Sequence, residues 1–203
     1  MNQLEIKWAE DKSKLPLSNS LKNIYFNAQY SHYQANGYFF DIQNPLTLND
    51  KIQWTKFFDQ QRDTINCTDK LLVKNFVYEK FNKKSYAKVL WESDNISNFP
   101  LDSLPDKFVL KTNNDSGTTF LIKNKKSFNF SSTFNKINHA LRNVYGVVYG
   151  EWSYAKLKPK VFVEEYINDG CYELASDYKF FCGQGEIFFC HYIYDRNSGH
   201  ASE

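Results

Sequence analysis

Apolar residues at helical spacing in the first half of the chain predict helices. A capping-box pattern at Thr47 and Asp50 precedes apolar positions that recur at i, i+3 and i+4 from Trp54, which predicts one helix. Thr68 is the expected N-cap of another helix, whose apolar face ends near Phe81. An earlier segment of unclear periodicity is also compatible with a helix. The predicted helices of this half are residues 21–33, 48–59 and 68–81.

The second half of the chain contains short β-prone runs and one helical pattern. The runs are rich in Val, Ile, Phe and Tyr and are bounded by turn residues, which is typical of strands. A helix capped by Ser131 or Ser132 has apolar positions at i, i+3, i+7 and i+10 from Phe134, and Gly146 lies at its end. The segment Gly183–Gly185 suits a hairpin turn. The predicted strands are residues 87–91, 108–111, 119–123, 160–166, 177–182 and 186–192.

The order of these elements predicts an α+β fold. A mostly helical N-terminal region with a connector, residues 1–105, precedes an α+β lobe, residues 106–203, in which a helix packs against a mainly antiparallel sheet. The 203 residues, 42% of them hydrophobic, can bury one substantial core that two lobes could share. The charge changes this picture little, because 25 basic and 23 acidic residues give a net charge of +2. Such a balance argues against nucleic acid or an anionic membrane as a partner.

The cysteines and the apolar runs indicate in which cellular compartment the protein lies. No two cysteines form a CxxC pair, so we expect buried, reduced thiols rather than zinc ligands or disulfides. No apolar run approaches the roughly 18 to 20 residues that span a bilayer, so no transmembrane segment is expected. The chain is therefore predicted to be cytoplasmic. The cysteines are Cys67, Cys171, Cys182 and Cys190.

A polar loop between two predicted strands has the parts of a phosphate site. Lys111 ends the first strand, and the segment NNDSGTT, residues 113–119, follows it. Consecutive backbone N–H groups in a turn can hold an anion, hydroxyl groups add donors, and the lysine supplies a point charge. The same residue types also form ordinary hairpin turns, and the pattern GxxxxGK[ST] is absent. The loop alone leaves both interpretations open.

Carboxylates in two later strands also need an explanation. Glu164 and Glu165 are adjacent within a β-prone run, so in an alternating strand one of them points toward the core and needs a partner. The alternative is a strand that ends at Glu165, with both carboxylates in solvent. Asp177 and Lys179 share one face of a later strand, where they could meet a polyphosphate or a metal, or pair with each other.

Taken together, these segments resemble the TupA-like branch of the ATP-grasp superfamily, which is named for a teichuronopeptide biosynthesis protein. The resemblance runs from about residue 40 to residue 196 and keeps the family's order. The segments that carry it are Asn44–Trp54, Thr68–Lys70, Leu104–Lys111, Gly150–Trp152, Lys158–Lys160, Val163–Ile167 and Asp177–Cys182.

The resemblance implies ATP between two lobes and a carboxylate that is activated as an acyl phosphate and then attacked by an amine. It makes Lys111 the catalytic residue, because a preplaced ammonium group stabilises the transferring phosphoryl group. It also implies a loop that covers the β- and γ-phosphates, an adenine hinge, and a later strand that faces the ribose, the phosphates or the substrate. The implied nucleotide-binding residues are Lys70, Lys111, Asn113, Ser116, Gly117, Thr118, Glu164, Glu165, Ile167, Asp177 and Lys179.

The chain departs from the family pattern in two places. Relatives usually carry His-Gly-Ser-Gly-Gly in the loop, whereas this chain has Asn114–Thr118, with Asp115 and Thr118 in place of glycines. The family's late carboxylate and asparagine, which bridge Mg²⁺ to the phosphates, lie beyond residue 203. Mg²⁺ is therefore implied as a cofactor without identifiable ligands, and we expect a truncated form. Arg196 is a further candidate for the anion-binding strand.

Three functions remain open at this point. The first is an ATP-dependent carboxylate–amine ligase, or a fragment of one, that joins an acidic saccharide or acidic peptide to an amine in surface-polysaccharide or teichuronopeptide-like assembly. The second is a glycosyltransferase of a polysaccharide cluster, although the chain has no Asp-x-Asp pair for a nucleotide sugar. The third is a catalytically silent interaction module. Whether the chain is an enzyme is thus left open.

Overall fold

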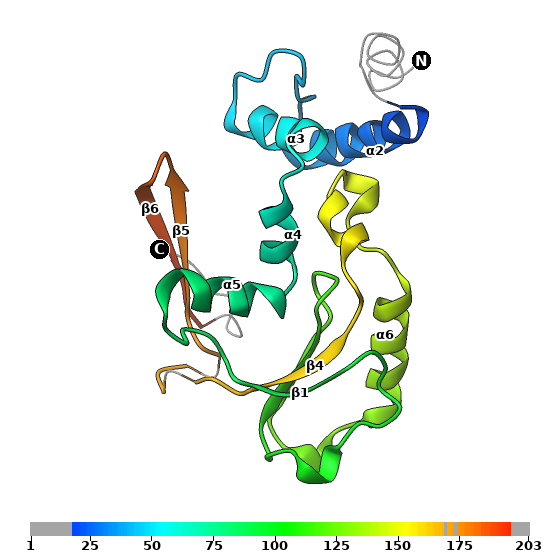
Figure 1. The fold of residues 1–203 in the computed structure, drawn as a ribbon, viewed down its shortest axis with the longest axis vertical. Helices are drawn as coiled ribbons and strands as arrows, with labels where there is room; N and C mark the ends of the chain where they lie inside the picture. Colours follow the sequence, from blue (N-terminus) through cyan, green and yellow to red (C-terminus); the bar gives the residue numbers. More distant parts are fainter. Residues whose placement is uncertain (1–17, 169, 173, 196–203) are drawn as a thin grey trace. The chain divides into compact units, whose positions relative to one another are not determined.

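The computed structural model describes residues 18–168, 170–172 and 174–195 (Figure 1). The chain divides into two compact units, Met1–Glu164 and Glu165–Glu203. Helices and antiparallel strands are both present, so the predicted α+β class is confirmed. The helices and strands are α2 (Asn19–Asn36), α3 (Leu48–Phe58), α4 (Arg62–Thr68), α5 (Leu72–Phe81), β1 (Val89–Ser93), β2 (Phe108–Thr112), β3 (Thr119–Ile122), α6 (Phe130–Arg142), β4 (Val161–Glu165), β5 (Asp177–Gly183) and β6 (Glu186–Ile193).

The helix predicted after Thr47 is confirmed as α3. Its capping box is complete, because the Asp50 N–H donates to Thr47 Oγ1 at 3.1 Å and the Thr47 N–H donates to Asp50 Oδ2 at 2.9 Å. Asp50 Oδ1 also accepts the Asp41 N–H at 3.0 Å. Burial alone would raise the pKa of the Asp50 carboxyl, but these hydrogen bonds outweigh it and hold the pKa below its usual value. Asp50 therefore fixes both the start of α3 and the segment before it.

The helix predicted from Thr68 is correct over its apolar part but wrong at its start. Thr68 is the last residue of α4, and its hydroxyl donates to the Thr64 carbonyl at 2.7 Å. Asp69 caps the start of the next helix instead, because its Oδ1 accepts the N–H groups of Leu71 and Leu72 at 2.7 and 3.2 Å. An ionised carboxylate is a better acceptor than a hydroxyl for the N–H groups at the start of a helix, which explains the shift of α5 to Leu72.

Strands β1 to β4 form the sheet of the larger unit, in the order β1-β4-β2-β3. β2 and β3 are the predicted antiparallel pair, with Lys111 opposite Thr119. β1 pairs antiparallel with β4, so the sheet takes strands from both sides of residue 105. The core at this sheet consists of Ile96, Leu104, Phe108, Leu110, Ile122, Ile137, Val161 and Val163.

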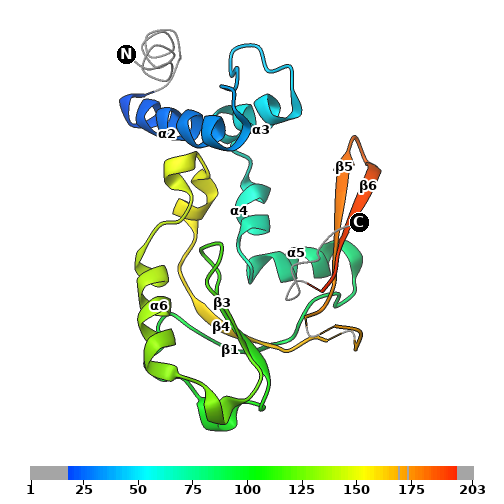
Figure 2. The same ribbon diagram turned by 180° about the vertical axis from the view of Figure 1, so that it is seen from behind.

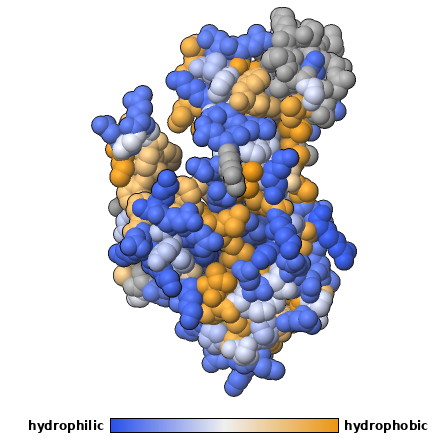
Figure 3. All heavy atoms as spheres, viewed as in Figure 1, coloured by the Kyte–Doolittle hydropathy of each residue, from blue (hydrophilic) through white to orange (hydrophobic). Residues whose placement is uncertain are grey.

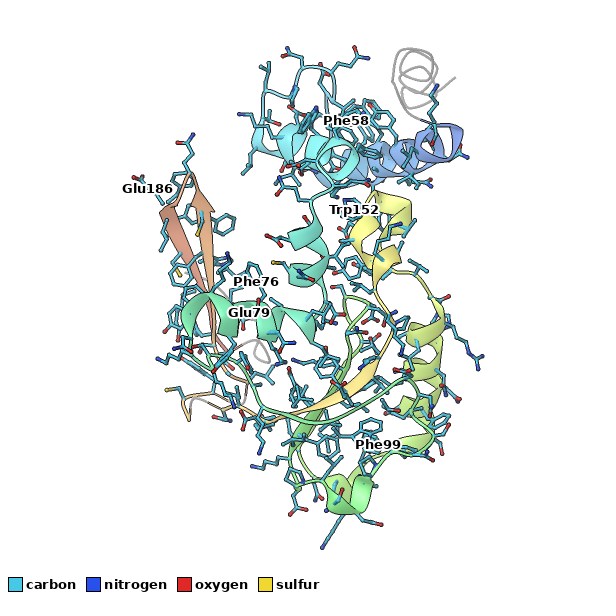
Figure 4. The ribbon with its side chains drawn as sticks, viewed as in Figure 1. Phe58, Phe76, Glu79, Phe99, Trp152 and Glu186 are labelled. Carbon is cyan, nitrogen blue, oxygen red and sulfur yellow. The ribbon has the colours of Figure 1, made fainter. Side chains whose placement is uncertain are left out.

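Helix α6 covers this sheet, as predicted (Figure 2). It begins two or three residues earlier than expected, because Asn129 Oδ1 caps it by accepting the Ser132 N–H at 3.1 Å. Ile137 is fully buried in the core beneath it. Phe99 packs edge-on against the Trp91 ring and lies at 5.2 Å from the Phe130 ring, so aromatic contacts tie the sheet to the start of α6 (Figure 4).

The smaller unit contains the predicted hairpin of β5 and β6. Its two-residue turn has φ of 53° at Gln184 and 82° at Gly185, the left-handed pair that a type I′ turn requires. The hairpin surface carries several apolar side chains (Figure 3). They are Tyr178, Phe180, Phe181, Ile187, Phe188 and Phe189.

The cysteines correct one expectation from the sequence. All four are free, but all four are exposed, so the prediction of buried thiols is wrong. Cys182 and Cys190 lie on the two-stranded hairpin, which no helix or second sheet of its own unit covers among the described residues, and Cys67 lies on an exposed position of α4. Among the described residues, no helix has both the length and the apolar composition that crossing a bilayer requires.

The Asp50 carboxylate generates a pH-dependent prediction. A folded pKa below the ordinary 3.8 means that its contribution to stability is present above that pH and is lost as the pH falls below it. We expect Asp50→Asn to lower the free energy of unfolding by about 1 kcal/mol at pH 7, with a smaller difference from wild type below pH 4. Urea titrations at several pH values measure this, with the exposed Asp106→Asn as the control. An equal difference at all pH values would contradict it.

Candidate functional site

Charged side chains from four segments of the larger unit gather at one end of its sheet. Strands β2 and β4 are neighbours in the sheet, which brings Lys111 beside Glu164. The turn before α5 and its first residues add Lys70 and Lys74, and the loop after β2 adds Asp115. We call this group the lysine–carboxylate cluster; its six members are Asp69, Lys70, Lys74, Lys111, Asp115 and Glu164.

Glu164 bridges two lysines inside this cluster. Its Oε2 lies 2.6 Å from Lys111 Nζ, and its Oε1 lies 2.6 Å from Lys74 Nζ. Glu164 is 5% exposed whereas Glu165 is exposed, so the expectation that one of the two carboxylates turns inward and finds a partner is confirmed. Two ammonium groups compensate the desolvation of one carboxylate here.

Lys74 is the member that reasoning from the sequence missed. It is 8% exposed, and its Nζ also donates to the Ala87 carbonyl at 2.9 Å and lies 5.2 Å from the centre of the Tyr86 ring. The available signal was a lysine next to Val73, on the apolar stretch of the predicted helix. A lysine in such a position needs an acceptor in the interior, and Glu164 supplies it.

Lys70 supports the loop that follows β2. Its Nζ donates to the Thr112 carbonyl at 2.7 Å and to the Asp115 carbonyl at 2.6 Å, and it lies 3.6 Å from Asp115 Oδ1. Burial lowers the pKa of the Lys70 ammonium below its usual value, against the opposing effect of Asp115. The charge of Lys111 also lowers this pKa and the charge of Glu164 raises it, so Lys70 interacts electrostatically with both residues.

The loop itself turns its carboxylate inward. Asp115, which stands where relatives carry glycine, is 8% exposed and accepts the hydroxyls of Thr112, at 2.6 Å, and Thr118. Ser116 and Gly117 form the exposed tip, with φ of 108° at Gly117. Within the described part of the chain, the backbone N–H groups of Ser116, Gly117 and Thr118 donate to no acceptor. The tip therefore presents unused donors, while the nearby carboxylate is satisfied by the protein.

Asn113 ties three segments together. Its Nδ2 donates to Asp69 Oδ2 at 2.8 Å and to the Lys158 carbonyl at 3.0 Å, and its Oδ1 accepts the Lys160 N–H at 2.7 Å. Both polar atoms of its amide are thus engaged by the protein. A nucleotide contact for Asn113 stays a prediction, and a contact made by its Nδ2 would have to replace one of these hydrogen bonds.

The remaining predicted site residues belong to the smaller unit. Asp177 and Lys179 lie in β5, opposite Ile193 and His191 of β6. The predicted hinge begins at Glu164, in the larger unit, and its other members lie past the division. Those members are Glu165 and Ile167, whereas Arg196 lies outside the described residues.

Two cavities of the larger unit lie beside the cluster without including its lysines. One, of about 720 Å³, lies between the loop tip and α6 and is lined by Gly117, Thr118, Lys136 and His139 among others. The other, of about 440 Å³, lies against Trp152, near α4 (Figure 4). Neither is lined by Lys70, Lys74 or Lys111.

Metal-binding side chains are not grouped in the part of the chain that the structure describes. No set of three or more His, Cys, Asp or Glu side chains there is close enough to hold a metal ion.

A comparison with protein families found a match over most of the chain. The TupA-like ATPgrasp family matches residues 50–201, which include all members of the lysine–carboxylate cluster. The chain therefore belongs to the TupA-like ATPgrasp family. Proteins of the ATP-grasp kind bind ATP, in general together with Mg²⁺. No curated protein and no solved structure gave a significant match.

The contacts of Asn113 predict a structural cost for its loss. Asn113→Ala would remove the partners that the side chain gives to Asp69 Oδ2, the Lys158 carbonyl and the Lys160 N–H, so we expect the free energy of unfolding to fall by about 1–3 kcal/mol. Urea unfolding followed by circular dichroism measures it, with the exposed Asn135→Ala as the control. A change within about 0.5 kcal/mol would show that these hydrogen bonds do not matter for stability.

Proposed function

We propose that this chain binds ATP through the lysine–carboxylate cluster, with Lys70 and Lys111 at the phosphates. The observation that carries the proposal is the loop tip, whose three N–H groups lack acceptors among the described residues while Asp115 is turned inward. Unpaired N–H groups in a turn are suited to a phosphate oxygen. The two lysine side chains keep 32% and 27% of their surface exposed, so an anion can reach them.

Each residue would have a distinct task in this proposal. Lys111 would stabilise the charge that develops on the transferring phosphoryl group, and Lys70 would hold a phosphate while keeping the loop in place. The N–H groups of Ser116, Gly117 and Thr118 would bind phosphate oxygens. Mg²⁺, when bound, would neutralise phosphate charge, and its protein ligands are not found as a group among the described residues.

The adenine and ribose contacts are proposed from the family resemblance alone. The main chain of Glu165 to Ile167 would read the adenine edge, together with the Glu164 carboxylate. Both Glu164 oxygens already accept lysine hydrogen bonds, so an adenine contact would use a remaining lone pair. Asp177 and Lys179 would face the ribose, the phosphates or the substrate.

Membership of the family extends the proposal to chemistry. We propose an ATP-dependent carboxylate–amine ligase that acts in the cytoplasm on an acidic saccharide or acidic peptide in surface-polysaccharide or teichuronopeptide-like assembly. The acid would attack the γ-phosphorus of ATP, ADP would leave, and the amine would displace phosphate from the acyl phosphate. We expect ADP release to require the acid, and repeated turnovers to require the amine as well. Release without either substrate would indicate a simple ATPase instead.

Nucleotide binding is tested through thermal unfolding. A ligand present at about 100 times its Kd stabilises a protein by about 2.7 kcal/mol, so millimolar ATP with Mg²⁺ should raise the Tm of the wild type. Lys111→Ala should abolish this increase, whereas Lys107→Ala, an exposed lysine just before β2, should retain it. A wild type without any shift would refute the proposed nucleotide binding.

The loop tip supplies a second arm of the same test. Gly117→Ala and Gly37→Ala both force an alanine to a positive φ, of 108° and 77°, with no atom within 4 Å of the new Cβ. Both variants should lose stability through backbone strain. Only Gly117→Ala should weaken ATP binding, since Gly37 lies at the end of α2. Equal ATP affinity in the two variants would exclude the loop from the site.

A further inference from the structure

We propose that Lys74 is a positioning residue, which holds Glu164 and thereby leaves Lys111 able to attract a phosphate anion. This inference rests on the proposed function, because it concerns the same phosphate site. Lys74 would not touch the nucleotide. It would act through Glu164, the carboxylate that both lysines share.

The geometry separates an inner from an outer lysine. The Lys74 side chain is 10% exposed and has three neighbours that fix it: Glu164, the Ala87 carbonyl and the Tyr86 ring. The Lys111 side chain is 27% exposed, and its Nζ pairs with the other oxygen of Glu164. An incoming anion can therefore reach Lys111, whereas the Lys74 ammonium is buried and already paired.

The charges of the cluster show why the inner lysine matters. Three lysines and three carboxylates sum to zero, and Glu164 with its two lysines carries a net charge of +1. Without Lys74, Glu164 and Lys111 would neutralise each other, and the whole cluster would carry −1. Coulomb interactions are weakly screened at buried groups, so this difference would act on a polyphosphate bound nearby.

Neighbouring contacts do not supply a replacement for Lys74. Lys70 is engaged by the Thr112 carbonyl and by Asp115. Asp69 is engaged by N–H groups at the start of α5 and by Asn113. The second cation on Glu164 is therefore specific to position 74, the third residue of α5.

The central experiment compares variants of the full chain by isothermal titration with inorganic tripolyphosphate and with ATP. Lys74→Met removes the charge but keeps an unbranched side chain, and it should weaken tripolyphosphate binding about tenfold, within the range measured for residues of one charge network. Lys74→Arg should restore binding to near the wild-type value. Lys80→Met, on the exposed end of the same helix, is the control and should bind like the wild type.

Glu164 provides a test with the opposite sign. Glu164→Gln raises the net charge of the cluster by one, so it should strengthen tripolyphosphate binding. The double variant Lys74→Met with Glu164→Gln returns the sum to zero and should recover most of the affinity that Lys74→Met loses. Damage to the fold alone cannot produce a gain in affinity, and the Glu164→Gln result stands even if Lys74→Met fails to fold.

The outcomes separate this inference from the proposed function. Tripolyphosphate binding that responds to Lys74 and Glu164 as stated, without ATP binding, would refute the proposed function and keep the role of Lys74. Wild-type affinity in Lys74→Met, or weaker binding in Glu164→Gln, would overturn the role of Lys74 even if ATP binds. Absence of binding to both ligands would overturn both proposals.

Discussion

The larger unit depends on one buried carboxylate that needs two cations. Glu164 follows three buried apolar residues in its strand and is itself buried, so a lone charge there would be costly to keep. Lys111 meets it from the adjacent strand and Lys74 from a helix, so the sheet and the helix must both be in place before the charge is compensated. Removal of one partner from a buried ion pair typically costs about 3–5 kcal/mol, which makes this contact a constraint on the fold as well as on the site.

The loop after β2 shows how the same region accommodates a departure from its family. A carboxylate beside a phosphate site would repel the ligand, yet Asp115 faces the hydroxyls of Thr112 and Thr118 and the ammonium of Lys70. These two hydroxyls donate to the carboxylate, so their hydrogens are not available to a ligand. The donors left over at the tip are backbone N–H groups, which depend on chain conformation rather than on side-chain identity.

Local patterns predicted most of the elements, and long-range contacts account for what was missed. The Thr47 capping box and the period of α6 depend on neighbouring residues only, so the sequence was sufficient for them. Strand alternation also predicted that one of Glu164 and Glu165 points inward, although it did not say which one. The identity of the second partner of Glu164 could not be predicted, because Lys74 is 90 positions away and only the folded chain joins the two. The start of α5 was missed because Asp69 competes better than Thr68 for the same N–H groups.

Asn113 has a consequence for the order in which the molecule assembles. Its amide connects Asp69, Lys158 and Lys160, whose positions are 44 to 47 residues away from it. Contacts across such separations require the closure of long loops, and chains that depend on them fold slowly. We therefore expect this part of the larger unit to form after the local helices. Occupancy of this region by a ligand would accordingly report a chain that has finished folding, rather than a partly folded intermediate.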